Sequence, residues 1–85
     1  MKIIDVLNFY YNLFPVIRLC VHMDGGIDGR YYNFTKAEAL KFLLGYTEEE
    51  AIKADFQTYD FFCGKVSKKL EIPRLYIVYK SSMAD

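Results

Sequence analysis

The stretch EEEAIKADFQTYDFFCGKVSKKLE, residues 48–71, decides the fold because it is the longest candidate in this chain for a single secondary-structure element. At about 100° per residue, its apolar side chains fall on one continuous stripe. That stripe consists of Ala51, Ile52, Phe56, Tyr59, Phe62, Cys63, Val66 and Leu70. Glutamates begin the segment and lysines lie toward its end, as the helix dipole favours. The pattern predicts a helix over 48–71, in which Gly64 costs about 1 kcal/mol and which stops before Pro73.

A second helix is predicted directly before this segment. Thr35 begins the sequence TKAE, whose spacing to Glu38 is that of a capping box. The helix should run over residues 36–44 and end at Gly45, which suits a left-handed backbone. Because Thr47 and Glu50 repeat the capping-box spacing, two helices should meet at residues 45–47.

Alternating apolar and polar residues predict the strands. In VIRLCVHM, residues 16–23, every second side chain is apolar, which is typical of a half-buried strand. RYYNF, residues 30–34, follows a glycine-rich stretch and should form an antiparallel hairpin with it. RLYIVYK, residues 74–80, supplies a third strand.

The first helix, predicted over residues 3–14, is apolar over most of its circumference. Only Asp5, Asn8 and Asn12 form a polar strip. An ordinary surface helix has an apolar stripe about 100° wide, so this helix should be covered on more than one side. The resulting fold class is α+β in the order α-β-β-α-α-β: one domain, residues 1–85, with a three-stranded, mainly antiparallel sheet packed against helices.

The overall composition excludes several functional classes. Eleven basic and eleven acidic residues cancel, so no net field attracts the whole molecule to nucleic acid or to an anionic membrane. Cys20 and Cys63 lack the close spacing of a metal knuckle or a redox pair. No apolar run is long enough to span a membrane, and the polar strip interrupts any signal-peptide core. We therefore expect a cytoplasmic protein with no membrane association.

The loop between the first two strands resembles a calcium loop only in part. Asp24, Asp28 and Gly29 match consensus positions of an EF-hand, but Gly26 and Thr35 stand where two further ligands are needed. The sequence thus predicts a structural turn, no metal and no cofactor.

Catalysis is not expected, although two groups keep the question open. His22 is the only histidine and shares a strand face with Cys20, but such a pair more often packs or forms a hydrogen bond. Asp55 interrupts the apolar stripe of the helix over 48–71 and would need a partner if it were buried. We expect no catalytic residue.

The expected function is that of a non-enzymatic interaction module. Phe61 falls opposite the apolar stripe and should be exposed, while Phe9, Tyr10 and Tyr11 lie on the outer side of the first helix. Such apolar surface is typical of protein interfaces. The sequence predicts a small accessory or regulatory protein that self-associates, as a homodimer, or docks on a protein partner.

An alternative function is the binding of single-stranded nucleic acid. If the first and last strands are neighbours, their less apolar sides form a basic and aromatic face of the kind that stacks on bases. Its residues would be Arg18, His22, Arg74, Tyr76 and Lys80.

Overall fold

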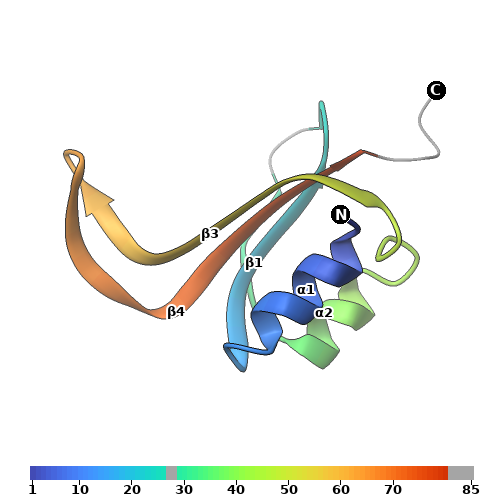
Figure 1. Ribbon diagram of the computed structural model, residues 1–85, viewed down its shortest axis with the longest axis horizontal. Coiled ribbons are helices and arrows are strands. Elements are labelled where there is room, and N and C mark those ends of the chain that lie inside the picture. Colours follow the sequence, from blue (N-terminus) through green and yellow to red (C-terminus); the bar gives the residue numbers. More distant parts are fainter. Residues whose placement is uncertain (27–28, 81–85) are drawn as a thin grey trace.

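Over residues 1–26 and 29–80, which this computed structural model describes, the chain forms two helices and four strands (Figure 1). The helices are α1 (Ile3–Tyr11) and α2 (Lys36–Phe42). The strands are β1 (Val16–Met23), β2 (Tyr32–Thr35), β3 (Glu50–Phe62) and β4 (Lys65–Lys80). The α+β class is confirmed, but the order is α-β-β-α-β-β, and the sheet has four strands where we expected three.

The sheet order β2-β1-β4-β3 places β1 and β4 side by side at its centre. These two strands are parallel, with Leu19 opposite Leu75. The outer pairings are antiparallel: β1 with β2, as expected across the glycine-rich loop, and β4 with β3. The first and last strands are therefore neighbours.

Both helices pack on the same face of the sheet. Successive side chains of a strand point to opposite faces, and alternate residues of β1 and β4 are buried in one cluster with α1 and α2. The fully buried members from the two strands are Ile17, Leu19, Leu75 and Ile77. On α1, the buried residues recur with helical spacing at Ile3, Val6, Leu7 and Tyr11. The opposite face of the sheet carries neither helix; we call it the open sheet face.

The capping box of α2 forms as predicted. The backbone N–H of Glu38 donates to Thr35 Oγ1 at 3.3 Å, and the backbone N–H of Thr35 donates to Glu38 Oε1 at 2.9 Å. These hydrogen bonds hold the pKa of Glu38 below its usual value. The helix ends at Phe42, and Gly45 adopts a positive φ of 91° in the turn that follows.

The expected second capping box does not begin a helix. The carbonyls of Thr47 and Glu49 instead accept hydrogen bonds from the backbone N–H groups of Ile4, at 2.8 Å, and Ile3, at 2.9 Å. The first N–H groups of any helix lack partners within the helix. The carbonyls of Thr47 and Glu49 therefore supply the acceptors that the start of α1 lacks.

The predicted helix over 48–71 is wrong, because these residues belong to an antiparallel hairpin of β3 and β4. Cys63 and Gly64 form its turn, with φ values of 52° and 77°. Two central residues with positive φ are typical of the turn that matches the twist of a hairpin. Gly64 is thus the point where the chain reverses and not a residue on the polar side of a helix.

Irregular pairing explains why the sequence of this hairpin has an apolar pattern like that of a helix. The register shifts between Ala51 and Lys53, between Gln57 and Tyr59, and between Asp60 and Phe61. Each shift leaves residues unpaired and disturbs the alternation of side chains. With its period of two interrupted, the apolar pattern resembles a helical one.

The largest irregularity bends the hairpin. Gln57 lies opposite Arg74, but Tyr59 lies opposite Lys69, so residues 70–73 of β4 face Thr58 alone. Pro73 lies within this irregular part of β4, where a residue without an N–H is tolerated. Beyond the bend, residues 59–69, the distal hairpin, project away from the helices (Figure 1). In the described ranges, neither helix is long and apolar enough to cross a membrane.

Candidate interaction surfaces

The end of the distal hairpin exposes large apolar side chains. We call residues 61–66 the hairpin tip. There, Phe61 is 57%, Phe62 74% and Val66 57% exposed. Phe61 was expected to be exposed because of its place on a helix; it is exposed because it lies near the turn of a hairpin.

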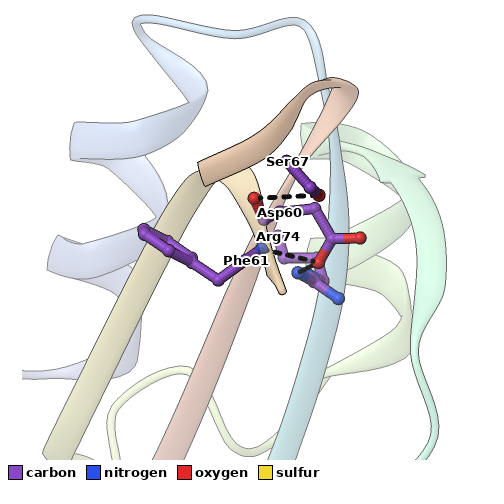
Figure 2. A network of polar contacts seen from close by, with 4 residues as sticks. All are labelled: Asp60, Phe61, Ser67 and Arg74. Carbon is purple, nitrogen blue, oxygen red and sulfur yellow. Dashed lines mark hydrogen bonds and ion pairs between the residues drawn. The ribbon is translucent and has the colours of Figure 1, made fainter. Parts of the chain in front are cut away.

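A polar network centred on Asp60 connects the hairpin tip to the rest of β4 (Figure 2). Asp60 Oδ1 accepts from Arg74 Nη2 at 3.1 Å and from the backbone N–H of Phe61 at 3.2 Å. The Ser67 hydroxyl donates to the Asp60 carbonyl at 3.4 Å. The Phe61 ring points away from the Asp60 carboxylate and the Arg74 guanidinium (Figure 2). The network thus orients the tip while leaving its aromatic ring uncovered.

The residues that we expected on the outer side of α1 lie in different environments. Phe9 is 60% exposed and meets Tyr10 edge-on, with ring centroids 5.0 Å apart. Tyr10 stacks on Phe56 of β3 at 4.2 Å. Phe61 lies instead at the hairpin tip, so the predicted partner-binding residues come from two elements, α1 and β3.

Tyr11 does not lie on the outer side of α1. It follows Leu7 by one helical turn and is therefore on the buried stripe, with 9% of its surface exposed. Its hydroxyl donates to the Phe34 carbonyl at 2.9 Å. Burial, with a smaller contribution from Glu38, raises the pKa of Tyr11 to about 12.

The open sheet face brings together the residues expected to bind nucleic acid. Arg18 lies opposite Arg74, and Cys20 lies opposite Tyr76. His22 Nε2 and the Tyr76 hydroxyl form a hydrogen bond. Lys80 lies at the end of β4, opposite Glu50 of β3.

Sequence reasoning missed the contribution of β3 to this face. An open depression of about 250 Å³ is lined by Tyr31, Lys53, Asp55, Gln57, Arg74 and Tyr76. Two cations lie over aromatic rings: Arg18 Cζ is 5.7 Å from the Tyr31 ring centroid, and Lys53 Nζ is 5.6 Å from that of Tyr76. A helix over 48–71 would have turned Asp55 away from Lys53 and Gln57, whereas a strand places all three on one side.

The groups considered for catalysis lie around Tyr76: Cys20 is opposite it on β1, and Asp55 is opposite it on β3. Asp55 is exposed at the rim of the open sheet face and is not buried in an apolar stripe. The His22 imidazole interacts with the Tyr76 hydroxyl and, through Nδ1, with the Met23 carbonyl at 2.9 Å. Cys20 is buried and Cys63 exposed, with no disulfide between them.

The glycine-rich loop is described in part. The backbone N–H of Asp24 donates to the Tyr79 carbonyl at 2.7 Å, which connects the end of β1 to β4. Asp28, considered above as a calcium ligand, lies outside the described residues. Within the described ranges, no group of three or more His, Cys, Asp or Glu side chains could hold a metal ion.

Comparison with protein-family models, with curated proteins and with solved structures finds no match to this chain.

Proposed function

We propose that this chain is a non-enzymatic protein-interaction module that docks on a protein partner through its hairpin tip. The observation that carries the proposal is the exposure of Phe61 and Phe62, 57% and 74%, at the end of a hairpin that projects from the body. Aromatic side chains supply much of the binding energy at protein interfaces when they enter a pocket.

The charges of the distal hairpin indicate what kind of pocket would fit. Three lysines, Lys65, Lys68 and Lys69, stand against one aspartate, Asp60, within residues 59–69. Asp60 is already paired with Arg74. The complementary surface would therefore be an apolar pocket with an acidic rim, because opposite charges at the rim favour encounter and orientation.

The test is affinity purification of the tagged chain from cells of its source. We expect a defined protein to copurify with the unaltered chain and to be reduced at least tenfold by Phe61→Ser combined with Phe62→Ser. Leu44→Ser is the matched control, because Leu44 is 81% exposed and lies outside the hairpin. Equal recovery with the double variant would overturn the proposal.

Single-stranded nucleic acid is a second candidate ligand, on the open sheet face. The specific observation in its favour is that Arg18 and Arg74 are neighbours across β1 and β4, beside two aromatic rings that already lie under cations. Basic groups bind phosphates and aromatic rings stack on bases.

Fluorescence anisotropy with a labelled single strand tests this second candidate. Binding should weaken as salt is added, and Arg18→Glu should weaken it further. Lys36→Glu makes the same change of charge on α2, on the helix-covered side, and should have less effect. The absence of binding at low salt would remove the candidate.

A further inference from the structure

Strand β3 forms an outer edge of the sheet, and most of that edge is open. The strand has 13 residues. Its start is covered, since the backbone N–H of Ala51 donates to the Met1 carbonyl at 2.8 Å and Lys2 bridges to Glu50. From Ile52 onward, no described segment pairs with its outer side. An open edge offers unpaired backbone groups to another strand.

Opposite charges flank Ala54 on this edge. Lys53 and Asp55 both line the depression on the open sheet face and so point to the same side, whereas Ala54 points to the other. Among the described residues, neither Lys53 nor Asp55 takes part in an ion pair within the chain.

These charges are self-complementary in an antiparallel pairing of two copies. With a two-fold axis through Ala54, Lys53 lies directly opposite Asp55 of the second copy, and Asp55 opposite its Lys53. Directly opposed residues have Cβ atoms about 4.5–5.5 Å apart, and opposite charges there are favourable. A pairing centred on Lys53 or on Asp55 would instead oppose like charges, which is destabilising.

The same register pairs two apolar residues. Phe56 would lie opposite Ile52 of the second copy, and Ile52 is exposed in the single chain. Phe56 carries the stacked Tyr10, against which Phe9 packs edge-on.

We propose that two copies of this chain pair along residues 52–56 of β3, antiparallel and centred on Ala54, so that their four-stranded sheets become one continuous sheet. The two-fold axis stands perpendicular to the sheet, so the helices of both copies cover the same face. This interface goes beyond the proposed docking function and uses a different surface, since the hairpin tip takes no part in it. A dimer would present two tips, and a partner with two pockets would bind it with greater avidity.

Sedimentation equilibrium over a range of concentrations tests the pairing. We expect the unaltered chain to dimerise. Asp55→Lys and Lys53→Asp should each raise the dimer dissociation constant at least tenfold, because each replaces two attractive pairs with two repulsive ones. Lys36→Asp, on α2, is the matched control for charge and should leave the constant unchanged.

Mixing the two variant chains then distinguishes a loss of pairing from a loss of folding. An equimolar mixture of the Asp55→Lys and Lys53→Asp chains should form heterodimers, and the double variant Lys53→Asp/Asp55→Lys should dimerise like the unaltered chain. A monomeric unaltered chain, or single variants that dimerise with unaltered affinity, would overturn the proposal. Phe61→Ser combined with Phe62→Ser should leave dimerisation intact, so failure of the docking proposal remains distinguishable.

Discussion

Strand β4 passes through two different environments. In its second half, Leu75 and Ile77 are fully buried beneath the helices, whereas in its first half Val66 is exposed at the hairpin tip. The helix-covered body is stabilised by burial of apolar surface. The distal hairpin is held instead by backbone pairing, a tight turn and the network around Asp60. Substitutions in β4 should therefore have very different effects on either side of the bend at residues 70–73.

The largest effect is expected in the buried half of β4. Leu75→Ala removes side-chain atoms from the core and leaves a cavity, so it should lower the free energy of unfolding by about 2–5 kcal/mol. Urea denaturation measures the change. Val66→Ala, in the same strand but exposed, should change it by less than about 0.5 kcal/mol. Equal losses of unfolding free energy at the two positions would show that the two halves of β4 do not differ in their contribution to stability.

The next effect concerns Tyr11, within the helix-covered body. Tyr11→Phe removes the hydrogen bond to the Phe34 carbonyl and should cost about 1 kcal/mol. Because burial raises the pKa of Tyr11 to about 12, the unfolded chain loses this proton before the folded chain does. The stability that Tyr11 contributes is therefore present below pH 10 and is lost as the pH rises toward 12.

Urea denaturation at several pH values from 9 to 12 checks this dependence. The titration of lysines is the same in both chains. The unaltered chain should therefore lose stability more steeply than the Tyr11→Phe chain, because it alone carries the Tyr11 hydroxyl. Parallel curves would contradict the burial of the Tyr11 hydroxyl.

A smaller effect, of opposite sign, is expected at the turn of the distal hairpin. Cys63 has a positive φ of 52°, which is unfavourable for most residues with a Cβ atom. Asn tolerates this conformation, and Asn-Gly is a preferred turn pair, so Cys63→Asn should stabilise the hairpin by about 0.5–1 kcal/mol. Amide hydrogen exchange over residues 59–69 should become slower. Faster exchange would contradict the turn, because it is the result expected if these residues formed a helix, where Asn has a low propensity.

The smallest effect is expected at the ion pair between Asp60 and Arg74. Asp60→Asn keeps an oxygen that can accept from the Phe61 N–H but removes the charge. Because both side chains are partly exposed, the loss should be under about 1 kcal/mol. Hydrogen exchange should quicken in the distal hairpin and stay unchanged at buried amides of α1. High salt should reduce the difference between the two chains; a difference that persists would mean that the charge is not responsible.

Some elements could be predicted from sequence because local chemistry specifies them. The capping box of Thr35 and Glu38 needs only residues close in the chain, and it forms. The alternation of residues 16–23 identified β1 because one side of that strand is buried under helices and the other is not. The proximity of Arg18 and Arg74 followed from the hypothesis that the first and last strands are neighbours, which the pairing confirms.

The hairpin could not be recognised from periodicity, because three register shifts disturb its alternation. Two signals in the sequence were nevertheless present. Residues 56–62 are rich in aromatic and β-branched side chains, which favour strands, and Gly64 stood in the middle of a predicted helix. Phe61 was correctly expected to be exposed, but Tyr11 was misplaced because the first helix offered several apolar sides and only packing selects one.

The central position of β4 has a consequence for the order in which this domain folds. Its inner neighbour, β1, is made of residues 16–23, so the middle of the sheet cannot close until residues 74–80 are available. Contacts between such distant parts of a chain must overcome a large loss of loop entropy before they become favourable. Folding should accordingly be slower than that of a helical domain of equal length, and nascent chains on the ribosome should leave β1 without its parallel partner until residues 74–80 have been made.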